Sequence, residues 1–97
     1  MFDWLNADNA KKFGMSTAQY FIEHVPSDER TGDKKFALKT KKTLDAMARQ
    51  AEDFKKANKL NFYKRAQLLN QFKWALREAG LSDDYINKLV LWLNKVL

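Results

Sequence analysis

The stretch Ala79-Gly80-Leu81-Ser82-Asp83-Asp84 ends one helix and begins the next, and it decides the fold. A glycine just after a helical run adopts the left-handed backbone conformation that closes a helix. Ser82 is a good N-cap for the helix that follows, and the two aspartates would face the positive end of its dipole. Leu81 can pack on Ile86 as a hydrophobic staple. Because this connection is short, the flanking helices are predicted to form an antiparallel hairpin.

The residues on both sides of this turn repeat with the period of an amphipathic helix. Residues 62–79 place one apolar face toward the predicted core, with Asn61 as N-cap. That predicted face comprises Phe62, Ala66, Leu68, Leu69, Phe72, Ala75, Leu76 and Ala79. Residues 83–96 carry an apolar face that is broad for a terminal helix.

A further helix is predicted over residues 9–24, where the apolar face stays in phase across Gly14. We therefore expect one continuous helix there rather than two that meet at the glycine. The missing side chain of Gly14, beside Phe13 and Phe21, would let a neighbouring helix approach closely. Pro26 ends this helix, and residues 25–32 have the composition of a flexible loop.

The last predicted helix covers residues 33–57, with Asp33 as its cap. The following segment Asn58-Lys59-Leu60-Asn61 is a weak break without glycine or proline, so one long rod through residue 79 is conceivable. Asn61 as an N-cap favours two separate helices. No segment alternates in the manner of a strand. The predicted fold is all-α, a single-domain four-helix bundle of orthogonal or irregular type over residues 1–97.

Composition excludes several classes of function. The chain has no cysteine, so disulfides, thiolate nucleophiles and cysteine-ligated metals are ruled out. His24 is its single histidine, and a lone imidazole without an obvious orienting partner is more typical of a packed or capping residue than of a catalytic one. No glycine-rich phosphate loop or catalytic triad pattern occurs. We therefore expect no enzyme, no cofactor, no metal and no small-molecule substrate.

The amino terminus lacks a secretory signal pattern, and the longest apolar run is Leu89–Leu93, too short to span a membrane. A cytoplasmic location is therefore expected. The net charge is +6, and twelve basic against four acidic residues fall between Arg30 and Arg65. A positive helix face of this kind can neutralise phosphates. The candidate nucleic-acid-binding residues are Lys35, Lys39, Lys42, Arg49 and Lys56. Because Asp45, Glu52 and Asp53 interrupt them, a solvated, salt-bridged helix face is the other interpretation.

Glu78–Ser82 resembles the turn of helix-turn-helix proteins, with a small residue, a glycine, an aliphatic residue and a capping serine. In such proteins the next helix reads DNA with its amino end. Here that end carries Asp83 and Asp84, which would repel phosphate, so DNA reading by this hairpin is not expected.

A second stripe on the 62–79 helix alternates aromatic and amide side chains, about 120° from its buried face. Its members are Tyr63, Gln67, Asn70 and Trp74. Large amphipathic side chains with hydrogen-bonding groups are what protein interfaces favour. The alternative is that Trp4, Leu5 or the loop after Pro26 folds over the stripe and buries it.

Leu91 and Trp92 raise the same question for the last helix. Its wide apolar face suits the core, another subunit or a membrane surface, and the moderate charge of the helix favours the membrane least. Together the stripe and this face predict a non-enzymatic protein–protein interaction or regulatory module. Its partner is expected to be another protein or a second copy of the chain. Nucleic-acid binding through the basic helix is the alternative function.

Overall fold

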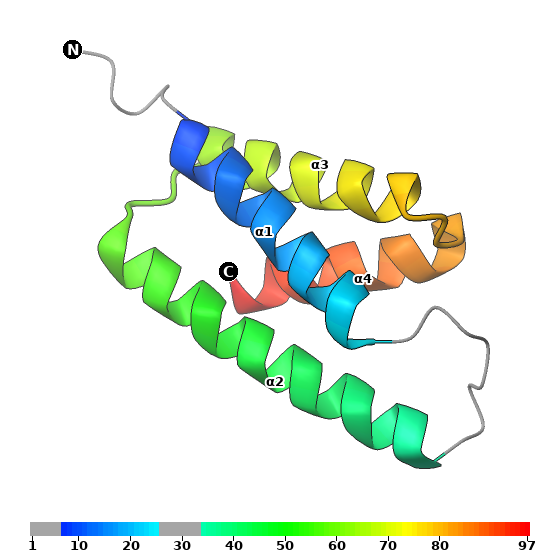
Figure 1. The fold of residues 1–97 in the computed structure, drawn as a ribbon. Helices are drawn as coiled ribbons and strands as arrows, with labels where there is room; N and C mark the ends of the chain where they lie inside the picture. Colours follow the sequence, from blue (N-terminus) through cyan, green and yellow to red (C-terminus); the bar gives the residue numbers. More distant parts are fainter. Residues whose placement is uncertain (1–6, 26–33) are drawn as a thin grey trace.

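The computed structural model describes residues 7–25 and 34–97, except for the side chains of residues 34–37 and 39. It contains four helices: α1 (Asp8–His24), α2 (Lys34–Ala57), α3 (Phe62–Glu78) and α4 (Asp83–Val96) (Figure 1). The predicted all-α four-helix fold is confirmed, and the predicted helix boundaries lie within one residue of the observed ones. The proposed cap Asp33 and the flexible loop, apart from Val25, lie outside the described residues.

The helices are arranged so that α1 and α3 run in the same direction while α2 and α4 run back (Figure 1). The largest packing interface joins α1 to α3, and α4 folds back on α3 as the predicted antiparallel hairpin. Within the described residues the backbone of α2 approaches α1 and α4 closely, but not that of α3.

Gly14 allows the close contact between α1 and α3. A Cβ atom built on this glycine would overlap the carbonyl oxygen of Leu68 and lie 3.3 Å from the backbone nitrogen of Phe72. The backbones of the two helices therefore touch at this point, which only a residue without a side chain permits. This confirms both the unbroken helix over α1 and the close approach predicted at Gly14.

The core lies between α1 and the α3–α4 hairpin, and α2 closes its remaining side. Apart from Phe21, the buried residues of α1 are small, whereas α3 and α4 bury bulky aliphatic and aromatic groups. Phe13 of α1 stacks on Phe54 of α2 with ring centroids 4.4 Å apart, which ties α2 to the bundle. The fully buried large side chains are Thr17, Phe21, Met47, Leu68, Phe72, Leu76, Ile86 and Leu93.

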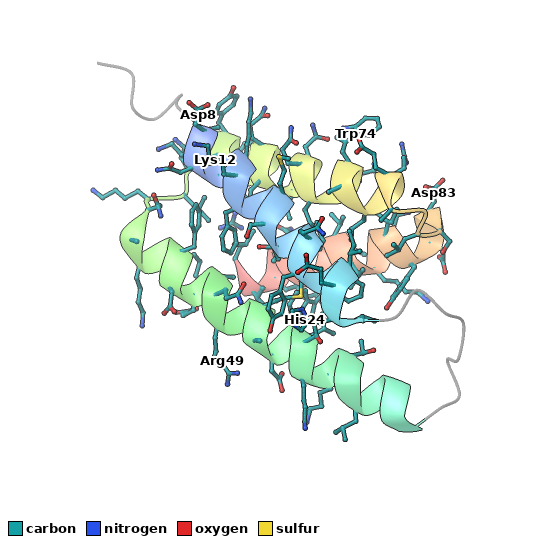
Figure 2. All side chains as sticks on the ribbon, viewed as in Figure 1. Asp8, Lys12, His24, Arg49, Trp74 and Asp83 are labelled. Atoms are coloured by element: carbon teal, nitrogen blue, oxygen red, sulfur yellow. The ribbon has the colours of Figure 1, made fainter. Side chains whose placement is uncertain are left out.

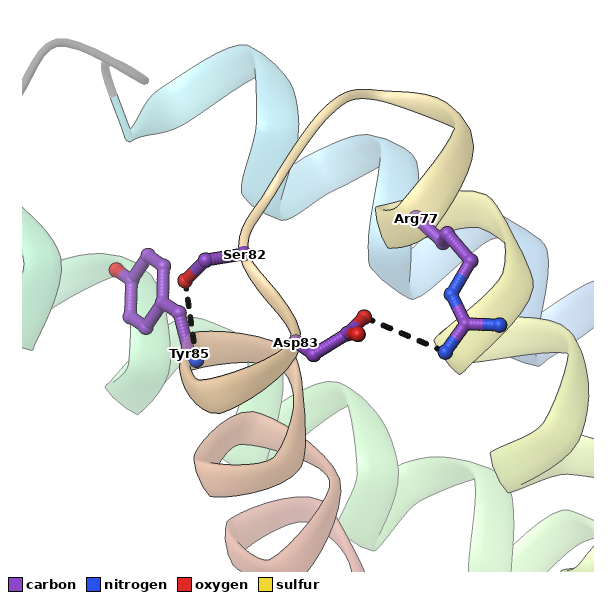
Figure 3. Close-up of polar contacts among 4 residues, drawn as sticks. All are labelled: Arg77, Ser82, Asp83 and Tyr85. Carbon is purple, nitrogen blue, oxygen red and sulfur yellow. Dashed lines mark hydrogen bonds and ion pairs between the residues drawn. The ribbon is translucent and has the colours of Figure 1, made fainter.

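The turn between α3 and α4 has the geometry that its residues predict. Gly80 has a φ of +92°, and its N–H donates to the carbonyl of Arg77, while the N–H of Leu81 donates to the carbonyl of Leu76. These two bonds form a Schellman motif. Ser82 then caps α4 by accepting a hydrogen bond from the N–H of Tyr85 (Figure 3).

The connection between α2 and α3 is a true break. The N–H and the side-chain amide of Asn58 both donate to the carbonyl of Phe54, which ends α2. The side chain of Asn61 accepts from the N–H of Lys64 at 2.8 Å and starts α3. Two helices, not one long rod, are therefore confirmed.

Some residues predicted to face the core do not. Phe62 is 89% exposed, and Ala66 and Ala79 are exposed as well. Phe62 is the first residue of α3, and helical side chains lean toward the N-terminus of their helix. Its ring therefore projects past the end of α3 instead of packing against α1.

Candidate protein-interaction surface on α3

The stripe predicted on α3 lies on the side of that helix that points away from the bundle. Tyr63 is 40% exposed, Trp74 is 48% exposed, and Asn70 between them is exposed. Figure 2 shows Trp74 projecting from α3 away from α2. Gln67 is half-buried and forms the edge of the stripe.

The rotation of α3 about its axis is fixed by its opposite face. Leu68, Phe72 and Leu76 are fully buried against the core cluster, so the helix cannot turn without exposing them. The side chains on the far side are consequently held outward. We call this set the outer face of α3; it comprises Phe62, Tyr63, Ala66, Asn70, Trp74 and Arg77, all exposed.

Phe62 and Ala66 belong to this surface although the sequence pattern assigned them to the core. A pattern of apolar residues identifies the apolar face of a helix. It does not show how far along that face a neighbouring helix extends. The signal that could have identified Phe62 is its position directly after the N-cap Asn61, at the end of the bundle.

Arg77 links the outer face to the α3–α4 turn. Its guanidinium carbon lies 5.2 Å from the ring centroid of Trp74, within cation–π range. The same guanidinium is 3.3 Å from a carboxylate oxygen of Asp83 (Figure 3). Both side chains of this ion pair are largely exposed, so the pair contributes little to stability.

Trp4, Leu5 and the loop after Pro26, the alternative cover of the stripe, lie outside the described residues. Tyr63 and Trp74 both remain partly exposed, so helices α1, α2 and α4 do not bury these two side chains.

The two candidate residues on α4 do not form one surface. Leu91 is 64% exposed, whereas Trp92 is half-buried and packs against the core cluster. Leu91 follows Lys88, which pairs with Asp84, and precedes Lys95. A single exposed leucine among charged side chains is ordinary for a protein surface.

The basic face of α2 is mixed in sign where it can be described. Lys42, Arg49 and Lys56 are exposed, and the side chains of Lys35 and Lys39 lie outside the description. Asp45, Glu52 and Asp53 are exposed on the same helix, and Glu52 pairs with Lys55 at 3.5 Å.

His24 makes local contacts only. It is exposed, its Nδ1 atom lies 2.8 Å from the carbonyl oxygen of Tyr20, and its ring stacks on that of Tyr20. In residues 7–25 and 34–97 no three acidic or imidazole groups are placed to hold a metal ion. Over the same residues, no helix combines the length and apolar character needed to cross a membrane.

Tyr85 of α4 is a partly buried tyrosine with a raised pKa. Burial raises the pKa of the Tyr85 phenol, because the phenolate would be poorly solvated against the core. Its ring packs edge-on against Phe21 at 5.9 Å between centroids. Tyr85 is thus a packing residue of α4, on a different helix from the outer face of α3.

Comparisons of the chain with protein-family models, with curated proteins and with solved structures find no match.

Proposed function

We propose that this protein is a non-enzymatic interaction module that binds another protein chain through the outer face of α3. The observation that carries the proposal is the exposure of Tyr63 and Trp74 on a helix whose opposite face is locked into the core. Tyrosine and tryptophan are the residues most often found at the energetic centre of protein interfaces.

The chemistry of the surface supports this proposal. Each ring offers a large apolar area together with a polar group, and Asn70 between them offers an amide donor and acceptor. Ala66 and Asn70 are small beside the rings, so a partner can approach the backbone of α3 between Tyr63 and Trp74. We propose no catalytic role, and we propose the cytoplasm as the location.

The experiment is the substitution Trp74→Ala in the full chain. Loss of an interface tryptophan should weaken association by about 2 kcal/mol while the melting temperature hardly changes. Association is measured by sedimentation of the pure protein and by capture of partners from native lysate on the immobilised chain. The control is Leu38→Ala, because Leu38 is 56% exposed on α2, whose backbone does not approach that of α3.

If Trp74 contributes to the fold of the monomer, its truncation should cost about 3 to 5 kcal/mol of stability. A large loss of stability with unchanged association would remove the outer face of α3 as a binding surface.

Nucleic-acid binding is the second candidate, supported by the exposure of Lys42, Arg49 and Lys56 along one helix. The interleaved acidic residues favour only weak binding, lost at physiological salt because few phosphates would be neutralised. Charge reversal of these three cations should abolish binding to a generic duplex. Tight, sequence-selective binding at physiological salt would make this candidate the main function.

A further inference from the structure

The first part of α2 places an exposed leucine among lysines. Residues 34–42 contain five lysines and no acidic residue, and Asp33 and Asp45 bound this run on either side. On a helix surface, the neighbours of a residue are three and four positions away in each direction. All four of these neighbours of Leu38 are lysines. We call the set the Leu38 cluster; it comprises Lys34, Lys35, Leu38, Lys41 and Lys42.

The Leu38 cluster lies on the side of α2 that faces away from the core. Met47 and Ala51, which are fully buried, lie on the opposite face of the helix. Leu38 is 56% exposed, and Lys41 and Lys42 are exposed as well. Within residues 7–25 and 34–97 neither of these two lysines forms an ion pair. Their charges are therefore available to an external anion.

We propose that the Leu38 cluster docks on an anionic membrane surface. Leu38 enters the hydrocarbon, and the lysines pair with lipid phosphates and carboxylates. Clusters of about four or more lysines on a helix are attracted to anionic headgroups. Long lysine side chains hold their ammonium groups at the headgroups while an apolar neighbour is buried below them. This inference goes beyond the proposed function, because it uses a different helix from the outer face of α3.

The position of Leu38 favours lipid over nucleic acid as the anionic partner. Nucleic acid binds lysines through the phosphates on its surface, so it would place the central leucine of the cluster against charged groups. An anionic bilayer has its charged headgroups directly above hydrocarbon. It therefore accommodates the leucine and the lysines at the same time.

The second part of α2 lacks this pattern and provides a matched control. Arg49 and Lys56 are exposed, but Glu52 and Asp53 lie between them in the sequence and are exposed as well. Lys42 and Arg49 are seven residues apart, which is about 10 Å along the helix. Exposed charges at this distance are largely screened from each other at physiological salt.

The first experiment measures sedimentation of the full chain with phospholipid vesicles at physiological salt. One set of vesicles contains phosphatidylcholine alone, and the other contains equal parts of phosphatidylcholine and phosphatidylserine. We expect at least about tenfold stronger partitioning onto the phosphatidylserine vesicles, because each lysine near an anionic surface strengthens binding about fivefold.

Two charge variants separate the Leu38 cluster from the net charge of the protein. Lys41→Gln/Lys42→Gln should weaken partitioning onto the phosphatidylserine vesicles by about tenfold or more. Arg49→Gln/Lys56→Gln removes the same charge from the second part of α2 and should have a much smaller effect. Thermal melts check that both variants are folded.

Two further substitutions test the apolar contact. Leu38→Gln should weaken partitioning severalfold, because the polar side chain does not gain from leaving water. Trp74→Ala should leave partitioning unchanged, so failure of this inference and failure of the proposed protein interaction are distinguishable.

A second experiment measures the orientation of the protein on the membrane. The chain contains no cysteine, so Leu38→Cys provides a single site for an environment-sensitive fluorophore. The emission of this label should shift to the blue on phosphatidylserine vesicles, because the label enters the hydrocarbon. The control Leu91→Cys labels an exposed position on α4 and should not shift.

Several results would overturn the inference. Equal partitioning onto the two kinds of vesicle, or equal losses in the two charge variants, would show that the Leu38 cluster does not select anionic lipid. Unshifted emission from the label on Leu38→Cys would exclude insertion at this position. Binding of a DNA duplex or of poly-glutamate that requires Lys41 and Lys42, without binding to phosphatidylserine vesicles, would assign the cluster to nucleic acid or to an acidic protein.

Discussion

Gly14 is the residue on which the helix packing depends most directly. The substitution Gly14→Ala improves intrinsic helix propensity by about 1 kcal/mol, but it places a methyl group inside the backbone of Leu68. The backbone of Leu68 cannot move away without separating α1 from α3. The steric cost of the added methyl group is therefore expected to exceed the gain in helix propensity. We expect a net loss of about 1 to 3 kcal/mol in the free energy of unfolding, measured by urea denaturation. A stabilised variant would mean that the two helices are further apart than described.

Thr17 carries a hydroxyl that finds no hydrogen-bond partner among the described residues, although the side chain is fully buried. Replacing it with the nearly isosteric valine removes an unsatisfied polar group and keeps the packing. Thr17→Val should therefore raise the free energy of unfolding by about 1 kcal/mol. The control Thr17→Ser keeps the hydroxyl and removes the methyl group, so it should destabilise the protein. Equal effects of the two substitutions would contradict this account.

Tyr85 gives the stability a dependence on alkaline pH. Because the folded state raises the pKa of the phenol, the folded protein holds this proton more tightly than the unfolded chain does. Stability from this group is complete below the unfolded pKa of about 10 and is lost as pH rises through the higher folded value. Denaturation of wild type and Tyr85→Phe across this range should show a steeper alkaline loss for wild type. Parallel curves would show that the phenol does not contribute.

At the scale of the element, the α3–α4 turn depends on backbone conformation rather than on packing. A Cβ atom on Gly80 would meet nothing within 4 Å, but the φ of +92° is unfavourable for residues that carry a side chain, and less so for asparagine than for alanine. Gly80→Ala should therefore cost about 1 kcal/mol, which a shift of the urea midpoint would report. Gly80→Asn should recover part of it, because asparagine tolerates this conformation. A loss as large as that of Gly14→Ala in both variants would point to a packing cause instead.

The same turn explains why the hairpin was predictable from sequence. The conformation of Gly80 and the cap Ser82 depend on a few neighbouring residues, so local chemistry is sufficient there. The exposure of Phe62 was not predictable in this way, because it depends on where α1, which runs in the same direction as α3, begins relative to the start of α3. Whether Tyr63 and Trp74 face outward depends on α2 packing against α1 and α4 rather than α3. Which helices α2 packs against depends on contacts along the whole chain, so no short stretch of sequence predicts it.

At the scale of the whole molecule, the described part of α2 buries less apolar area than α3 does. Among the side chains of α2 that the structure describes, Met47 and Ala51 are fully buried, whereas α3 buries Leu68, Phe72 and Leu76 completely. Helices with less buried apolar area open at lower free energy. Native-state hydrogen exchange should therefore show faster exchange of the amides of Met47 and Ala51 than of those of Leu68 and Phe72. Equal protection in α2 and α3 would show that the four helices open as one unit.

The parallel course of α1 and α3 has a consequence for the order of folding. Gly14 meets Leu68 across a sequence separation of more than half the chain, whereas α3 and α4 meet across one tight turn. Closing a long loop costs entropy before any contact rewards it. We therefore expect the α3–α4 hairpin to form first, and α1 to dock onto it after α2 has brought the chain back to the same end of the bundle.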